Sequence, residues 1–253
     1  MSKFDLGDSL AQLALGKPLL AFDFDGTLAP IVPRPEWARV PDALAEVLGR
    51  VAERFPVAII TGRKIDDVRH RLGFSPWAII GSHGAECETR PKLNLSYALR
   101  LDEARQRLLD NAEELTFAGV AIEDKQQSIA LHYRSASNHA RALGLIQRCL
   151  EGLGDELRVY PGKCVVNVVC GDAPDKLHTV RRLQQASGCE AVFFVGDDTN
   201  DEPVFAGAEQ AWVTVRIGGQ DDSAARCTLR HQDDLAAMLV TLLMPTPEQA
   251  GGS

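Results

Sequence analysis

The chain has 253 residues, of which 45% are hydrophobic and 25% are charged, and its net charge is −8. An acidic surface of this kind does not attract polyanions, so we expect neither nucleic acid nor an acidic membrane as a partner. No apolar run approaches the roughly 20 residues that cross a bilayer. The cysteines form no CxxC pair, so these features together predict a cytoplasmic globular protein with reduced thiols.

Short apolar runs alternate with helical patterns over most of the chain. The segment 41–55 repeats apolar residues at helical spacing, and 176–185 and 233–243 follow the same pattern. Apolar strands that alternate with helices are typical of an α/β fold whose parallel sheet is covered on both faces. The expected strands are LLAFDFDG (19–26), VAIITGR (57–63), WAIIGSHG (77–84), AVFFVGDD (191–198) and AWVTVRIG (211–218).

The middle of the chain has a different rhythm, in which helices alternate with pairs of antiparallel strands. This order is typical of a small α+β module. We therefore expect a module at 90–172 that is inserted into an α/β core formed by 1–89 and 173–253. Its expected elements are a charged helix over 97–116, a strand pair over 120–134, a helix over 138–153 and a strand pair over 157–171 around Pro161-Gly162.

Carboxylates follow two of the apolar strands, although a buried and unpaired carboxylate is costly. Asp23 and Asp25 follow the first strand, Asp197 and Asp198 follow AVFFVG, and Lys176 begins a helical pattern. Ligands of open α/β sheets bind beyond the carboxyl ends of the strands, which is where these groups fall. A divalent cation such as Mg²⁺ would offset the carboxylates and leave coordination positions for a phosphate.

Four motifs in chain order, DFDGTL, TGR, Lys176 and GDDTNDE, resemble those of the haloacid dehalogenase superfamily of aspartate-nucleophile phosphatases. Within that superfamily the chain is similar to the trehalose-6-phosphate phosphatases, through FDFDGTLAPIVPRPEWARVP, AIITGR, IIGSHGAE, ALHYR, GKCVVNV and GDDTNDEPVF. The resemblance implies a Rossmann-like core with a parallel sheet and an inserted α+β cap of the C2 type. It also implies Mg²⁺-dependent hydrolysis of trehalose 6-phosphate through an aspartyl-phosphate, with a trehalose-phosphate synthase as a possible partner in the same pathway.

The same resemblance implies roles for the residues at the ends of the strands. Asp23 would be the nucleophile, and Asp25 would act first as general acid and then as general base. Thr61 and Lys176 would hold the phosphoryl oxygens as charge builds on them. The implied metal ligands are Asp23, Asp197 and the backbone carbonyl of Asp25, while Asp198 and Asp201 would orient water and Lys176.

The resemblance further implies a set of substrate contacts, one of which departs from the family pattern. Where the family has a glutamate after GKxxV, this chain has Asn167, and the change bears on selectivity for the trehalose headgroup. The run CGDAPDKL also replaces a more typical proline-containing run that ends in Lys-Gly. The implied substrate-binding residues are Gly26, Thr27, Gly62, Arg63, His83 and Glu86 in the core and Glu123, Lys125, Arg134, Lys163 and Asn167 in the cap.

Other functions fit the same motifs. The same chemistry would serve another sugar phosphate or a phosphorylated glycoside such as sucrose 6-phosphate, and Asn167 favours this alternative. A phosphosugar mutase and a non-catalytic sensor on the same fold are further alternatives, although a sensor would not need both Asp23 and Asp25. Glu123 and Lys125, which alternate along one expected strand, could also form only a solvated strand face.

Overall fold

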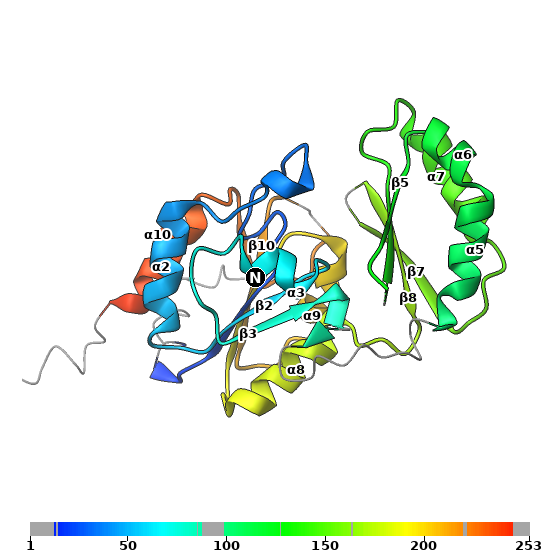
Figure 1. Ribbon diagram of the computed structural model, residues 1–253. Coiled ribbons are helices and arrows are strands. Elements are labelled where there is room, and N and C mark those ends of the chain that lie inside the picture. Colours follow the sequence, from blue (N-terminus) through cyan, green and yellow to red (C-terminus); the bar gives the residue numbers. More distant parts are fainter. Residues whose placement is uncertain are drawn as a thin grey trace, which may run out of the picture. The chain divides into compact units, whose positions relative to one another are not determined.

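The computed structural model describes residue 13 and residues 15–84, 86–87, 99–126, 128–162, 164–219 and 222–244. The chain divides into two compact units (Figure 1). We call Met1–Glu88 with Asp175–Ser253 the core unit, and Thr89–Pro174 the inserted unit. Among the described residues, no helix has the length and apolar character needed to cross a membrane.

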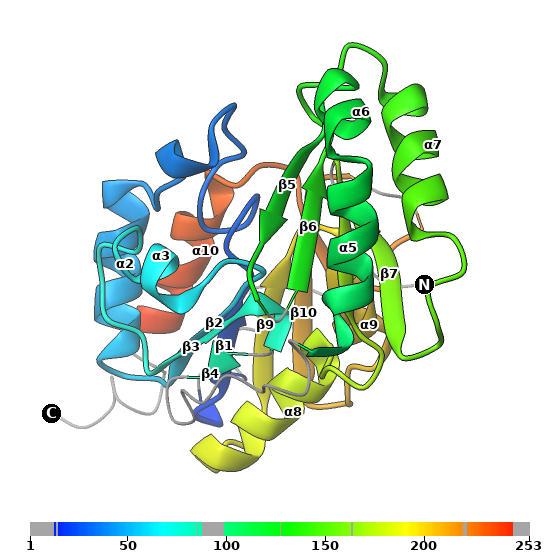
Figure 2. The ribbon, with the colours of Figure 1, turned by 45° about the vertical axis from the view of Figure 1, so that its right-hand side comes forward.

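The core unit is built on a seven-stranded sheet with the order β11-β10-β9-β1-β2-β3-β4 (Figure 2). All neighbouring strands run parallel except β4, which pairs antiparallel with β3. The chain proceeds from β1 toward β2 on one side and from β9 toward β10 on the other, so the strand order reverses between β1 and β9. The strands are β1 (Leu19–Phe22), β2 (Val57–Ile60), β3 (Ala78–Gly81), β4 (Glu86–Cys87), β9 (Val192–Gly196), β10 (Trp212–Ile217) and β11 (Cys227–Leu229).

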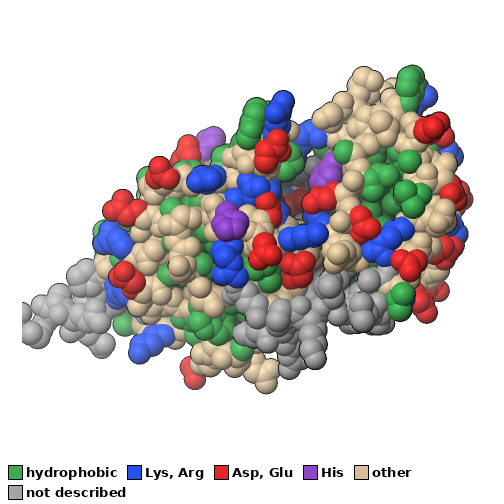
Figure 3. All heavy atoms as spheres, viewed as in Figure 1, with side chains coloured by type: hydrophobic (Ala, Val, Ile, Leu, Met, Phe, Trp, Pro, Cys, Tyr) green, Lys and Arg blue, Asp and Glu red, His purple; other side chains and the backbone are tan. Residues whose placement is uncertain are grey.

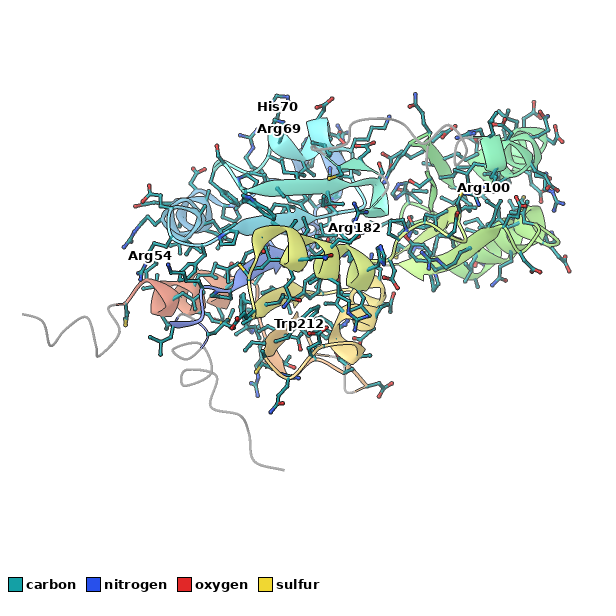
Figure 4. The ribbon with its side chains drawn as sticks, turned by 90° about the horizontal axis from the view of Figure 1, so that it is seen from below. Arg54, Arg69, His70, Arg100, Arg182 and Trp212 are labelled. Carbon is teal, nitrogen blue, oxygen red and sulfur yellow. The ribbon has the colours of Figure 1, made fainter. Side chains whose placement is uncertain are left out.

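Helices cover both faces of this sheet. Successive residues of each strand point to opposite faces, and apolar residues occur at both sets of positions. In β1, Leu20 and Phe22 belong to the cluster packed by α2, α3 and α10, whereas Leu19 and Ala21 belong to the cluster packed by α8 and α9. Arg54 donates a hydrogen bond to the carbonyl of Leu243 at the end of α10 (Figure 4). The helices are α2 (Asp42–Ala52), α3 (Ile65–Arg69), α8 (Lys176–Ser187), α9 (Glu202–Ala206) and α10 (Asp234–Leu243), with the short 3₁₀ turns η1 (Pro35–Trp37), η2 (Ser82–Gly84) and η3 (Thr199–Asp201).

The inserted unit is a four-stranded antiparallel sheet with the order β5-β6-β8-β7, packed on one face by three helices. Its core includes Ile129 and Leu131 from β6, Val166 and Val168 from β8, and the apolar residues of the helices. The elements are β5 (Ala121–Asp124), β6 (Ser128–His132), β7 (Leu157–Gly162), β8 (Val165–Cys170), α5 (Asp102–Asp110), α6 (Ala112–Phe117) and α7 (His139–Leu150).

The predicted α/β fold with a parallel core sheet and a smaller inserted α+β sheet is confirmed, and all six cysteines are free thiols. Figure 3 shows acidic and basic side chains interspersed on the visible face rather than gathered by sign. The first strand is shorter than LLAFDFDG suggested, because β1 ends at Phe22 and both of the following aspartates lie in the turn beyond it.

Two details of the predicted insertion were wrong. The charged stretch over 97–116 is not one helix, because Asn111 separates α5 from α6 and donates its side-chain amide to the carbonyl of Arg107. Asparagine competes with the helical backbone in this way. Pro161 and Gly162 lie within β7 rather than in the turn, and β7 is an edge strand, where the missing N–H of a proline is tolerated.

Two adjacent leucines of α5 provide a test of this packing. Leu108 is 2% exposed and Leu109 is 67% exposed. Leu108→Ala should therefore lower the free energy of unfolding by roughly 2–5 kcal/mol. Leu109→Ala should change it by less than about 0.5 kcal/mol. Urea denaturation of both variants beside the wild type measures the difference, and equal effects would contradict the orientation of α5.

Candidate active site

Three buried carboxylates meet where β1 and β9 end side by side. Asp23 directly follows β1 and Asp197 directly follows β9, while Asp201 closes the turn after β9. The side chains of all three are buried, and one oxygen from each lies within 4.8 Å of the others. The strand order reverses between these two strands, which is the point where open α/β sheets bind ligands.

Burial raises the pKa of Asp23 well above its usual range, and the nearby carboxylates of Asp201, Asp197 and Asp25 raise it further. The ammonium group of Lys176 opposes these effects, because its Nζ lies 3.0 Å from Asp23 Oδ1. One lysine therefore does not balance this group of acids. A cation bound among oxygen donors would lower the electrostatic cost of the cluster, which is the chemistry expected of a divalent metal site.

Lys176 is the first residue of α8 and is itself buried among acids. Its Nζ also lies 2.6 Å from Asp201 Oδ1. Burial alone would lower the pKa of Lys176, but the carboxylates of Asp201 and Asp23 outweigh burial and raise it. Lys176 is therefore held as a charged ammonium beside Asp23.

Asp201 differs from the other two acids because both of its oxygens are already used. Its Oδ2 accepts hydrogen bonds from the backbone N–H groups of Asp197 and Asp198, each at 2.9 Å, and its Oδ1 accepts from Lys176. Asp23 and Asp197 are consequently the carboxylates that could hold a metal ion. Asp198 caps the η3 turn, where its side chain accepts from the N–H of Thr199 at 2.7 Å.

The turn after β1 packs directly against the Asp197 carboxylate. A Cβ atom on Gly26 would lie 2.1 Å from Asp197 Oδ2, and the φ of Gly26 is +87°, a conformation that favours glycine. The hydroxyl of the neighbouring Thr27 donates to Asp197 Oδ1 at 3.2 Å. These two residues therefore bring the DFDGT turn and the Asp197 loop into contact.

Asp25 points toward a different partner. Arg63 donates Nε and Nη2 to its two carboxylate oxygens, each at 2.7 Å, and Nη1 to Asp67 at 2.9 Å. The guanidinium also lies over the ring of Phe24, with Cζ 5.4 Å from the centroid. Burial would lower the pKa of Arg63, but its hydrogen bonds to these acids raise it. Arg63, expected among the substrate-binding residues, thus orients the Asp25 carboxyl group.

The remaining core residues of the expected site lie on neighbouring turns. Thr61 follows β2 and is buried, and its hydroxyl oxygen accepts a hydrogen bond from the N–H of Arg63 across Gly62. Glu86 accepts from the N–H of Ile65 at 3.0 Å and from the Ser82 hydroxyl at 2.9 Å, which ties two loops together. The side chain of His83 lies outside the described part of the chain.

In the inserted unit, one row of residues across the sheet carries several polar side chains. Glu123, Ala130, Asn167 and Tyr160 stand directly opposite one another across the four strands, so their side chains share a face. Ile129, Leu131, Val166 and Val168, which alternate with this row, belong to the apolar cluster packed by the helices, and Tyr160 at the edge of the row also packs against that cluster. Tyr160 was not among the expected residues, although strand alternation around Asn167 could have indicated it.

A charged cluster is centred on Glu123 at one end of this row. Its Oε2 lies 3.0 Å from His132 Nε2 and 3.4 Å from Lys125 Nζ. The hydrogen bond from His132 lowers the pKa of Glu123 to about 2, helped by Lys125 and opposed by burial. Of the other two expected cap residues, Arg134 is exposed just after β6, and Lys163 lies outside the described residues.

Sequence reasoning missed one charged residue near the acidic cluster. Arg216 lies at the end of β10 and is 4% exposed, and it donates hydrogen bonds to the Asp197 carbonyl and to Glu202. Other strand ends of this chain carry charged side chains that belong to the expected site. The basic residue near the end of the apolar run AWVTVRIG could therefore have indicated Arg216.

Together, a doubly wound α/β sheet, an acid cluster at its switch point and an inserted α+β unit define the haloacid dehalogenase class. The C-terminal domain of trehalose-6-phosphate phosphatase from C. albicans has this fold. Its TM-score to this chain is 0.81 at 20% identity, over 96% of this chain and 98% of that one.

Comparison of the sequence with known proteins identifies the family of the chain. Residues 21–231 match the model of the trehalose-phosphatase family, and the chain belongs to that family. It is 32% identical to the trehalose-phosphate phosphatase of Mycobacterium avium over 88% of this chain, and 32% identical to an uncharacterized glycosyl hydrolase of Mycobacterium tuberculosis over 87%. The matches span 57% and 18% of those two longer proteins, respectively.

The Glu123 cluster has a definite pH dependence. The folded pKa of Glu123 is about 2, below its ordinary value of 4.5, so its contribution to stability is present above pH 4.5 and is lost as the pH falls toward 2. Glu123→Gln should cost about 0.5 kcal/mol at pH 6, because this carboxylate is half exposed. Urea denaturation between pH 6 and pH 3 should show that difference shrinking.

His132→Leu removes the main partner of Glu123 and serves as the control. In that background, Glu123→Gln should have a smaller effect with a weaker dependence on pH. A difference that grows as the pH falls, in either background, would contradict the assigned ion pair.

Proposed function

We propose that this chain is a Mg²⁺-dependent phosphatase that hydrolyses trehalose 6-phosphate to trehalose and inorganic phosphate. The observation that carries the proposal is the buried pair Asp23 and Asp197 with Lys176 beside it, at the switch point of the sheet. Membership of the trehalose-phosphatase family supports the choice of substrate. A trehalose-phosphate synthase in the same pathway would supply that substrate.

The donor set around Asp23 fits a hard divalent cation. Asp23, Asp197 and the backbone carbonyl of Asp25 would hold Mg²⁺, while Asp201 keeps Asp197 and Lys176 in place. When bound, Mg²⁺ supplies positive charge that offsets the buried carboxylates and the charge of the phosphoryl group. Burial and the neighbouring acids raise the pKa of Asp23, and a cation bound beside it would stabilise the carboxylate form.

Asp23 is the nucleophile of the first step. Its carboxylate oxygen attacks phosphorus, the bond from phosphorus to the sugar oxygen breaks, and an aspartyl-phosphate forms on Asp23. Lys176 supports this step because its ammonium group, 3.0 Å from Asp23 Oδ1, can also reach an oxygen of the incoming phosphoryl group. Thr61, at the end of β2, offers a hydroxyl to the same oxygens.

Asp25 handles the protons of both steps. Its carboxyl group donates a proton to the departing sugar oxygen and then takes one from the water that attacks the aspartyl-phosphate, which releases phosphate and restores Asp23. Both oxygens of Asp25 accept hydrogen bonds of 2.7 Å from Arg63, so Arg63 orients this carboxyl group and has to release one of its oxygens before Asp25 donates a proton. We therefore assign Arg63 a positioning role instead of direct sugar binding.

The inserted unit contributes the sugar contacts. We assign the polar row of Glu123 and Asn167, together with Lys125 and Arg134, to the hydroxyl groups of the sugar. Asn167 supports a second candidate substrate, another sugar phosphate such as sucrose 6-phosphate, because a neutral amide replaces the glutamate of the family pattern. An amide both donates and accepts hydrogen bonds, whereas a carboxylate only accepts them.

Phosphate release from a panel of sugar phosphates tests the function. We expect release from trehalose 6-phosphate to exceed release from glucose 6-phosphate by at least about tenfold in kcat/KM, since a disaccharide fills more of the polar row than a monosaccharide does. Release from trehalose 6-phosphate should also exceed release from sucrose 6-phosphate, because the fructose ring of sucrose directs its hydroxyl groups differently. Treatment with EDTA should abolish release, and Mg²⁺ should restore it. A preference for sucrose 6-phosphate would support the second candidate, and no release from any of them would overturn the proposal.

Asp23→Asn tests the chemistry separately from the substrate. The amide cannot attack phosphorus, so turnover should fall at least about 10³-fold. The fold should persist, because Lys176 keeps its partner Asp201 at 2.6 Å and the two side chains are nearly equal in size. Circular dichroism and thermal unfolding verify the fold, and a variant that releases phosphate at the wild-type rate would show that Asp23 is not the nucleophile.

A further inference from the structure

Arg216 is a buried cation next to the acidic cluster, and the mechanism above does not use it. It lies near the carboxyl end of β10, where its Cα is paired in register with Gly196, the last residue of β9. Asp197 is the next residue after Gly196. The guanidinium group of Arg216 therefore reaches the main chain of the loop that carries the Asp197 carboxylate.

The contacts of Arg216 and Asp201 hold that loop from opposite sides. Arg216 Nη2 donates to the Asp197 carbonyl at 2.8 Å, and Nη1 donates to the Asp198 carbonyl at a longer 3.4 Å. Asp201 accepts from the N–H groups of the same two residues, each at 2.9 Å. A cation thus binds the C=O groups and an anion binds the N–H groups of the same short segment.

Such side-chain contacts are needed because the sheet stops before this segment. β9 ends at Gly196, and in the turn beyond it the Asp198 carbonyl accepts a hydrogen bond from the N–H of Asp201 at 3.1 Å. Asp197 is buried, and a buried backbone carbonyl requires a hydrogen-bond partner, which Arg216 provides. The planar guanidinium of an arginine holds its donors in a rigid fork with fixed directions, whereas the three donors of a lysine rotate on a single nitrogen. The carboxylate of Glu202, 2.8 Å from Nη1, balances the buried charge.

We propose that Arg216 is a positioning residue for the metal site, which fixes the main chain of Asp197 so that its carboxylate points toward the bound cation. The inference rests on the proposed Mg²⁺ dependence but concerns a residue that touches neither metal nor substrate. Partners that orient a ligand from outside typically change metal affinity by 10–100-fold when they are removed.

The sign of the effect separates this role from simple electrostatics. Arg216 is a positive charge close to a site for a positive ion, so its removal would tighten Mg²⁺ binding if only charge mattered. If Arg216 positions Asp197, its removal weakens binding instead. Arg216→Lys keeps the charge and loses the fork, and so isolates the geometric contribution.

The experiment is isothermal titration of the full chain, stripped of metal with EDTA, with MgCl₂. We expect Arg216→Met to raise the Kd for Mg²⁺ by about tenfold or more, and Arg216→Lys to raise it by at least about threefold. Arg226→Met is the matched control, because Arg226 also donates to backbone carbonyls, those of Glu209 and Gln210, but away from the acidic cluster. That variant should bind Mg²⁺ within about twofold of wild type.

Thermal unfolding in EDTA shows whether each variant is folded. If Arg216→Met does not fold, Arg216→Lys decides the question. An Arg216 variant that is folded and less stable, but binds Mg²⁺ as tightly as wild type or more tightly, would overturn the positioning role and leave the proposed function intact. Asp197→Asn should bind no Mg²⁺. If the wild-type chain also bound no Mg²⁺, that result would overturn the metal dependence itself.

Discussion

The site depends on the cost of burying carboxylates close together at the end of a hydrophobic sheet. Lys176 relieves part of that cost, because its ammonium group lies between Asp23 and Asp201 at 3.0 and 2.6 Å. The pKa of Asp23 nevertheless stays raised, first because burial disfavours its charged form and then because the neighbouring acids repel it. Such a cluster could bind a metal ion, whose charge would offset the buried carboxylates.

The surrounding structure divides the acids by what they already hold. Asp201 uses both oxygens on the backbone and on Lys176, and Asp25 is held by Arg63, so Asp23 and Asp197 are left as the candidates to share an ion. Neighbouring aspartates therefore differ in what they do: Asp201 holds a loop backbone, Asp25 pairs with Arg63, and Asp23 and Asp197 are candidates to share an ion. The difference lies in hydrogen-bond partners, since these fix the direction in which each carboxyl group can act.

In the inserted unit, too, hydrogen-bond partners fix the direction of the charged side chains. Its sheet buries apolar residues against α5, α6 and α7, while Glu123 and Asn167 belong to a row that alternates with them. Glu123 there is half exposed and is paired with His132 and with the buried Lys125. Such a row offers both donors and acceptors to hydroxyl groups, which supports the proposed recognition of a sugar.

The sequence by itself determined the fold class, the inserted α+β unit and the residues of the acidic cluster, because apolar periodicity and charged strand ends are local signals. Only the tertiary structure decided which partner each acid has. Nothing near Asp25 in the chain points to Arg63, 38 positions away, and nothing in WVTVRIG shows that Arg216 reaches the Asp197 carbonyl. The physical reason is that these contacts join neighbouring strand ends, and the pairing of strands is a property of the whole sheet.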